Sequence, residues 1–137
     1  MVEALYANYG DICPLKKIIE LKNQYKVRLF VDECFSFGVL GSTGRGITEH
    51  LGVPMDEIDH ISSSLENSIS AYGGFCAGTS FIVDHQRLSG LGYCFSASLP
   101  SLQAAAAIAA LDLLEKRPQM IENLRKNCKQ AHEKLQE

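Results

Sequence analysis

Two adjacent carboxylates, Asp32 and Glu33, stand at the end of an apolar run, residues 27–31, that predicts a buried strand. A glycine-rich turn follows them over residues 38–46. Ligands of open α/β sheets bind just beyond the carboxyl ends of the strands. A carboxylate held there can pair with a cationic ring nitrogen, which is how proteins tune pyridoxal phosphate. The alternative interpretation is that both acids only end the strand and cap the turn.

The segments around these acids predict the unit that would position them. Residues 2–7 have the pattern of a short strand, and Pro14 opens a helix with an apolar face that runs to about Tyr25. The strand over residues 27–31 follows after almost no loop. A strand, a helix and a second strand form a βαβ unit. We therefore expect the two strands to be parallel neighbours with a right-handed crossover.

The rest of the chain alternates short apolar runs with helical patterns. The predicted elements are a helical turn over 47–51, a turn over 54–57, a strand over 58–62, hairpin arms over 75–77 and 81–83, a short helix over 83–88, a strand over 93–96, and helices over 101–116 and 119–136. This alternation predicts an α/β fold with a mainly parallel sheet and flanking helices.

The composition excludes several classes of protein. The 137 residues carry a formal net charge of -3, so the chain has no basic footprint for nucleic acid. Its five cysteines are an odd number without a CxxC pair, which indicates thiols in a reducing compartment rather than a disulfide framework or a zinc site. The histidines are scattered and make no metal set with these cysteines. No apolar run reaches the roughly 18 residues of a membrane span.

The stretch from Asp32 to Gly46 resembles a family signature, Asp-Glu-Ala-His-Ser-x-Gly-Val-Leu-Gly-x-x-Gly-Arg-Gly. The signature belongs to the α-oxoamine synthases, which are pyridoxal-phosphate enzymes of fold type I. Phe35 stands where the family has histidine. The matching positions are Asp32, Glu33, Ser36, Gly38, Val39, Leu40, Gly41, Gly44, Arg45 and Gly46.

Residues 84–100 carry a narrower resemblance, to the first long-chain-base subunits of serine palmitoyltransferases, a non-catalytic branch of the same family. The resemblance implies part of a fold type I, aspartate aminotransferase-like large domain. It places residues 1–100 in that domain, and residues 101–137 in a connecting helix and the start of the small domain. Because enzymes of this fold are much longer, we expect the chain to be a fragment that is poorly stable alone.

The residue at the position of the family's reactive lysine is Asn67. Active members carry Thr-x-x-Lys-Ser-x-Gly-x-x-Gly-Gly-Tyr, and counting back from Gly73 and Gly74 aligns Asn67 with that lysine. An amide cannot form an imine, because its nitrogen lone pair is delocalised. No lysine lies between Lys26 and Lys116. The chain therefore lacks the amine that Schiff-base chemistry needs.

The resemblance implies a subunit that works through a partner. The partner, the lysine-bearing catalytic subunit, would hold most of the pyridoxal phosphate, and the complex would condense L-serine with palmitoyl-CoA to 3-ketosphinganine. It would act at the cytosolic face of the endoplasmic reticulum membrane. Asp32, Ser96 and Ser98 are the candidate cofactor contacts in this chain, although hydroxyls near a helix start can equally serve as its cap. The alternative is an active α-oxoamine synthase or aminotransferase-like enzyme with its own pyridoxal phosphate.

The glycine-rich turn has two interpretations of its own. Gly41-x-x-Gly44-Arg45-Gly46 could cradle a phosphate, but it lacks the Gly-Lys-Ser/Thr ending of a nucleotide loop. The interpretation we favour is a structural turn with Arg45 at a subunit contact.

Overall fold

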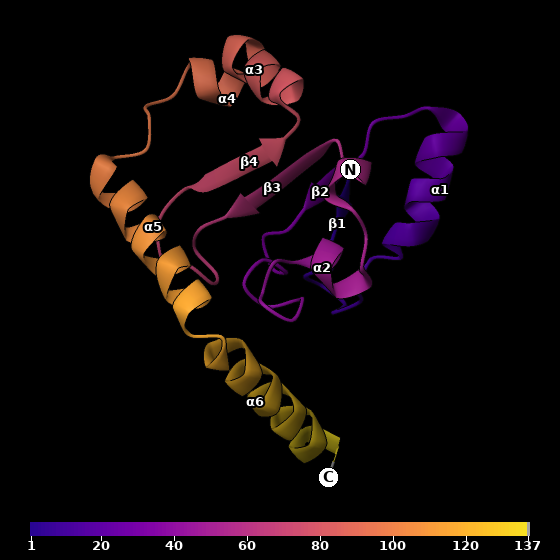
Figure 1. The fold of residues 1–137 in the computed structure, drawn as a ribbon, viewed down its shortest axis with the longest axis vertical. Coiled ribbons are helices and arrows are strands. Elements are labelled where there is room, and N and C mark those ends of the chain that lie inside the picture. Colours follow the sequence, from indigo (N-terminus) through magenta and orange to yellow (C-terminus); the bar gives the residue numbers. More distant parts are fainter. Residues whose placement is uncertain (137) are drawn as a thin grey trace.

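The computed structural model describes residues 1–136, which form a small sheet with helices around it (Figure 1). The amino-terminal half contains β1 (Val2–Glu3), α1 (Leu15–Tyr25), β2 (Phe30–Asp32), α2 (Ile47–Leu51), the 3-10 helix η1 (Met55–Glu57) and β3 (His60–Ser64). The carboxyl-terminal half contains β4 (Gly74–Gly78), α3 (Ser80–Ser89), α4 (Leu91–Cys94), α5 (Ser101–Lys116) and α6 (Gln119–Gln136).

The sheet has the order β1-β2-β3-β4. β1, β2 and β3 are parallel, and β4 pairs antiparallel with β3 over the whole length of both strands. The predicted mainly parallel sheet and the predicted βαβ unit of β1, α1 and β2 are therefore confirmed. The carboxyl ends of the three parallel strands meet at one edge of the sheet, which is where the two adjacent acids lie.

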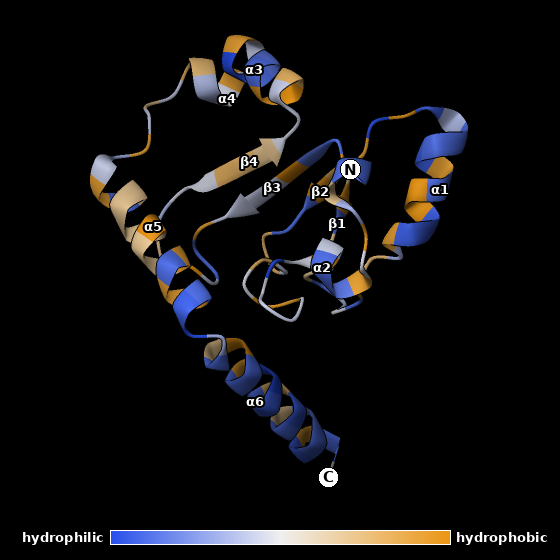
Figure 2. Ribbon diagram, viewed as in Figure 1, coloured by the Kyte–Doolittle hydropathy of each residue, from blue (hydrophilic) through white to orange (hydrophobic). Residues whose placement is uncertain are grey.

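The main hydrophobic core lies between α1 and the parallel strands. Its buried members are Ala4, Cys13, Leu15, Ile19, Leu29, Val31, Ile47 and Ile58. Helix α1 contributes its apolar stripe to this core, and Figure 2 shows that stripe beside the hydrophilic residues of the same helix. A smaller cluster, Leu65, Ile69, Ala71 and Ala107, joins the segment after β3 to α5.

Two predicted strand assignments are wrong. Residues 81–83 form the first turns of α3, and residues 93–94 belong to α4. Both segments are short apolar runs with β-branched or aromatic side chains, and such runs cannot be assigned from periodicity alone. In the structure β4 pairs with β3, and residues 81–83 add no strand to its other edge. The predicted short helix is confirmed, but it begins at Ser80.

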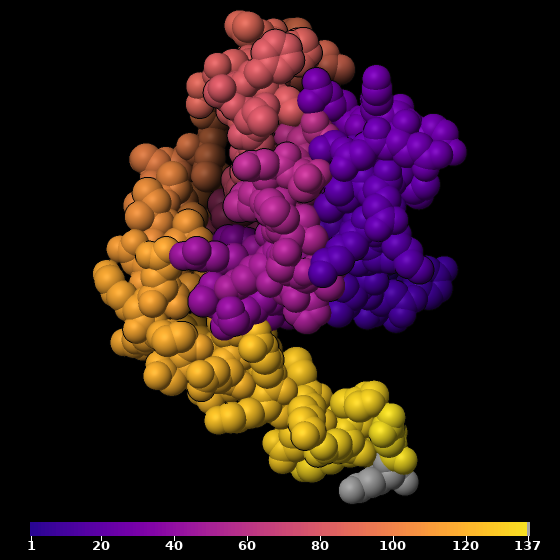
Figure 3. Space-filling view, turned by 45° about the vertical axis from the view of Figure 1, so that its right-hand side comes forward, coloured from indigo at the N-terminus to yellow at the C-terminus, as the bar shows by residue number. Residues whose placement is uncertain are grey.

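The two carboxyl-terminal helices were predicted at the bounds that the structure gives. Pro118 separates α5 from α6, as expected for a residue that cannot continue a helix. The two helices lie along one side of the body, and α6 extends beyond it (Figures 1 and 3). Within residues 1–136, no helix is both long enough and apolar enough to span a membrane.

Candidate functional site

A row of polar side chains crosses the sheet near the carboxyl ends of its parallel strands. The strand register aligns Glu3 with Asp32, Asp32 with Ser62, and Ser62 with Cys76. Residues paired in this way project to the same face of a sheet. The fold therefore places two carboxylates, a hydroxyl and a thiol side by side on one face.

Asp32 borders a hollow at this edge. It is half-buried, and its Oδ1 accepts a hydrogen bond of 2.8 Å from the backbone N–H of Cys34. Its other carboxylate oxygen accepts no hydrogen bond from residues 1–136, so it is available to a cationic group. The hollow has a volume of about 220 Å³ and is lined by Glu3, Leu5, Ala7, Asp32, Cys34 and Phe35.

Glu33, the next residue, has a different role. Its side chain is buried, with 2% of the residue exposed. Its carboxylate accepts hydrogen bonds from the Ser36 hydroxyl and, at 3.1 and 3.2 Å, from the backbone N–H of Ile47. Gly46 has a φ of +87°, and a Cβ there would lie 2.3 Å from the Glu33 carboxylate, so only glycine fits. Glu33 therefore holds the turn to the start of α2.

The environment of Glu33 also changes its titration. Burial raises the pKa of this carboxyl, and the negative charge of Asp32 adds to the rise. The hydrogen bonds from Ser36 and Ile47 act in the opposite direction, but burial prevails. The interpretation that the acids cap the turn is therefore correct for Glu33, whereas Asp32 keeps an open side.

Asn67 lies beside this turn, where the sequence alignment placed the lysine of active relatives. Its Nδ2 donates a hydrogen bond of 2.8 Å to the backbone oxygen of Cys34 and a weaker one of 3.5 Å to Oγ of Ser64. The amide thus ties the end of β3 to the turn after β2. The fold therefore places position 67 beside the backbone of Cys34, two residues after Asp32.

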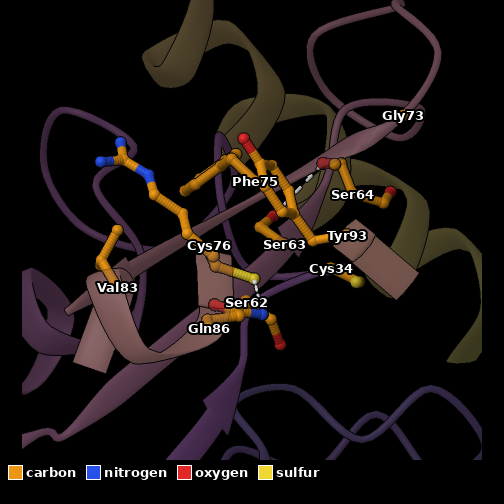
Figure 4. A pocket seen from close by; sticks show the side chains of 12 residues that line it. Cys34, Ser62, Ser63, Ser64, Gly73, Phe75, Cys76, Val83, Gln86 and Tyr93 are labelled. Atoms are coloured by element: carbon orange, nitrogen blue, oxygen red, sulfur yellow. Dashed lines mark hydrogen bonds between the residues drawn. The ribbon is translucent and has the colours of Figure 1, made fainter. Parts of the chain in front are cut away.

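A larger hollow of about 510 Å³ opens on the other side of Cys34, between β3, β4, α3 and α4 (Figure 4). Its walls are Cys34, Ser62, Ser63, Ser64, Gly73, Gly74, Phe75, Cys76, Val83, Gln86, Arg87 and Tyr93. Gln86 donates from Nε2 to Sγ of Cys76 at 3.4 Å. No lysine lines this hollow or the smaller one. Both hollows therefore lack an amine supplied by this chain.

Cys34 lines both hollows, and sequence reasoning did not single it out. Burial raises the pKa of its thiol, and the nearby Asp32 carboxylate reinforces the rise, whereas Ser64 acts to lower it. The raised pKa favours the neutral thiol over the thiolate that a nucleophile needs. Tyr93 was also missed, because it lies in a segment that the sequence assigned to a strand.

The structure does not bring Ser96 and Ser98 into either hollow. Both are exposed in the segment between α4 and α5. The Ser96 hydroxyl donates to the backbone oxygen of Gly92, and no side chain caps the start of α5. Because the predicted phosphate contact is with a neighbouring subunit, their role stays a prediction.

The glycine-rich turn folds around another carboxylate, Glu49. This side chain accepts hydrogen bonds from the Ser42 hydroxyl at 2.7 Å, from N–H and hydroxyl groups of Thr43, and from the Arg45 N–H at 3.1 Å. Burial acts to raise the pKa of Glu49, but these hydrogen bonds lower it to about 2. Because the amides of Thr43 and Arg45 already bind a protein carboxylate, the structural interpretation of this turn is favoured over a phosphate cradle.

Comparisons with known proteins identify the family and the fold of the chain. A family model described as aminotransferase class I and II matches residues 2–137. Long chain base biosynthesis protein 1b of Oryza sativa subsp. japonica is 50% identical over 135 residues, covering 98% of this chain and 28% of the relative. Serine palmitoyltransferase 1 of Dictyostelium discoideum is 47% identical over 135 residues, with the same two coverages.

A solved structure gives the same result for the fold. The structure of SPT with a PLP internal aldimine has a TM-score of 0.84 and 31% identity, covering 92% of this chain and 31% of that one. The fold type I architecture and the resemblance to the α-oxoamine synthases are thereby confirmed. The chain spans 28% of the length of the two relatives named above.

Proposed function

The chain belongs to the aminotransferase class I and II family, and we propose that it is part of a non-catalytic subunit of serine palmitoyltransferase. The complex would condense L-serine with palmitoyl-CoA to 3-ketosphinganine, in sphingolipid biosynthesis. The similarity to Serine palmitoyltransferase 1 supports this assignment. The observation that carries the non-catalytic role is Asn67, whose amide bonds to Cys34 and Ser64 where an active relative needs a lysine amine.

The residues of the site fit pyridoxal phosphate only in part. Asp32 offers an unpaired carboxylate oxygen to a ring N–H, but Asn67 offers no amine, and no lysine reaches either hollow. Pyridoxal phosphate withdraws electrons from a developing carbanion when it is bound. We assign that chemistry to the partner subunit, which would supply the lysine and hold most of the cofactor. Asp32, Ser96 and Ser98 remain candidate contacts.

The domain assignment and the location follow from the same proposal. Residues 1–100 would belong to the large domain, and residues 101–137 to the connecting helix and the start of the small domain. The complex would act at the cytosolic face of the endoplasmic reticulum membrane, as a heterodimer of this subunit and the lysine-bearing one. What this chain does in it is structural: Glu33 and Asn67 fix the turn that carries Asp32.

The alternative is an active enzyme with its own cofactor, and one experiment separates the two. The protein is purified with its partner, treated with borohydride, and both chains are digested for mass spectrometry. We expect the reduced cofactor on a lysine of the partner only. An adduct on Lys26, Lys116 or any other amine of this chain would contradict the proposal. Absence of a lysine-bearing homologue from the purified protein would also contradict it.

A variant at position 67 provides the matched control. Asn67→Lys introduces an amine at the aligned position, and Asn67→Ala removes the amide without adding one. If the position is aligned with the reactive lysine, borohydride can attach the cofactor to Asn67→Lys but never to Asn67→Ala. Attachment of cofactor to the Asn67→Ala chain would show that its amine lies elsewhere and that the alignment is wrong.

A further inference from the structure

The glycine loop, residues 41–46, contacts α6. Arg125 of α6 donates from Nη2 to the backbone oxygen of Gly41. Ile121 of α6 is buried, with 2% of the residue exposed, although most of the helix is exposed. A Cβ on Gly44, whose φ is +83°, would lie 3.0 Å from Cδ1 of Ile121. A hydrogen bond and an apolar contact therefore join the helix to the loop.

The direct connection between α5 and the loop is weaker. Arg45 and Glu115 approach to 3.8 Å, but their side chains are 71% and 75% exposed. Exposed ion pairs of this kind contribute little free energy. A hollow of about 500 Å³, bordered by Phe37, Leu111, Leu114 and Pro118 among others, separates the loop from this part of α5. Because the backbone leaves helical geometry at Arg117, with φ -130° and ψ 68°, α5 does not itself fix the direction of α6.

The shape of the loop depends on Glu49, which does not belong to the loop or to α6. Its carboxylate collects the donors of Ser42, Thr43 and Arg45. The backbone closes the same turn, because the N–H of Gly46 donates to the oxygen of Leu40 at 3.0 Å. Glu49 therefore holds the loop that Arg125 and Ile121 contact.

We propose that the glycine loop is a seat that anchors α6 to the body, and that Glu49 is the positioning residue that shapes this seat. This inference concerns the attachment of the helix and does not depend on the proposed function. It gives the Gly41–Gly46 motif a role in joining the sheet to the carboxyl-terminal helix. It also predicts that a change at Glu49 reaches α6, although the hydrogen bonds of the Glu49 side chain come from the loop.

Hydrogen–deuterium exchange of the purified protein tests this coupling. In Glu49→Gln, one carboxylate oxygen becomes an amide nitrogen and can no longer accept. We expect the amides of residues 121–128 to exchange about tenfold faster, since charge-assisted hydrogen bonds of the loop are lost. The amides of α1 should keep their rates. Faster exchange in the loop with unchanged exchange in α6 would overturn the proposal.

Two further variants keep the result clear. Glu122→Gln removes a carboxylate of α6 that forms none of the hydrogen bonds joining this helix to the loop, and we expect no change in exchange. An equal change in Glu122→Gln would show a general charge effect and overturn the role of Glu49. If Glu49→Gln unfolds the protein, seen as faster exchange in α1 as well, Arg125→Met decides. Arg125→Met should raise the exchange rates of the α6 amides by a similar factor while the loop amides keep theirs. Unchanged exchange in α6 would overturn the proposal that the loop anchors this helix.

Discussion

The two ends of the central strands carry acids with opposite surroundings. At the amino ends, Asp59 is buried and accepts hydrogen bonds of 2.9 Å from the Leu29 N–H and 2.6 Å from Arg28, with Lys22 at 3.4 Å. At the carboxyl ends, Asp32 keeps one oxygen open toward a hollow. A carboxylate whose oxygens are all occupied by protein donors can only hold structure. The open one can still bind something.

Glu33 is adjacent to Asp32 in the sequence, yet its carboxylate resembles that of Asp59, because it is buried and hydrogen-bonded to protein donors. Its donors come from Ser36 and Ile47, and its side chain is buried. Position at a strand end therefore does not make an acid functional. Asp32, Glu33 and Asp59 differ in how many hydrogen-bond donors the protein supplies to each carboxylate.

The largest effect should come from Glu33→Ala. The change leaves the Ile47 N–H and the Ser36 hydroxyl without a partner in a buried place, so we expect a loss of about 3 kcal/mol in the free energy of unfolding. Urea unfolding followed by circular dichroism measures it. Glu20→Ala, which removes an exposed carboxylate of α1, is the matched control and should change stability by less than about 0.5 kcal/mol. A loss at Glu33 no larger than the control would contradict a structural role.

Asp59→Asn should follow, with a loss of about 2 kcal/mol at pH 7, because an amide cannot accept from all of the donors. Burial acts to raise the pKa of Asp59, but the Leu29 N–H, Arg28 and Lys22 lower it below its usual range. A lowered folded pKa stabilises the folded state above the unfolded pKa, and this contribution disappears as the pH falls through the folded value. The difference between wild type and variant should therefore shrink below about pH 4. A constant difference across that range would contradict the pairing.

Lys22→Met tests one cation of the same cluster and should cost about 1 kcal/mol. Lys22 donates to the backbone oxygen of Glu57 at 2.7 Å, and its side chain is 15% exposed. Lys16→Met removes an exposed lysine of the same helix and serves as the control. Equal midpoints in urea for both variants would show that Lys22 does not contribute to the cluster.

The smallest effect on stability should come from Asp32→Asn, below about 0.5 kcal/mol, because asparagine keeps the acceptor for the Cys34 N–H. If Asp32 pairs with a cofactor ring, the same variant should still lower the activity of the purified complex. Stability and activity are measured on one preparation. A stability loss as large as that of Glu33→Ala would place Asp32 with the structural acids and end the comparison.

The local hydrophobic pattern explains both the elements that the sequence predicted and those that it assigned wrongly. The parallel unit around α1 and the helices α5 and α6 were predicted, because each shows its period within its own residues. Residues 81–83 and 93–96 were assigned to strands on β-prone composition, and the structure puts residues 81–83 and 93–94 in helices. Whether either segment joins the sheet depends on residues outside the local window, and β4 pairs with β3 rather than with residues 81–83. The larger hollow was missed for the same reason.

Only the fold decided that none of the chain's lysines lines either hollow. The sequence by itself determined that asparagine stands at position 67 and that no lysine lies from 27 to 115. The sequence also determined the parallel sheet, since the hydrophobic periods of its strands and helices can be recognised from neighbouring residues alone. Only the tertiary structure showed that Glu33 is buried among its donors whereas Asp32 keeps an open oxygen, and that Glu49 binds the donors of the glycine loop. Their hydrogen-bond partners lie at separations that range from two residues for Asp32 to fourteen for Glu33, and three-dimensional packing alone decides which donors reach which oxygen.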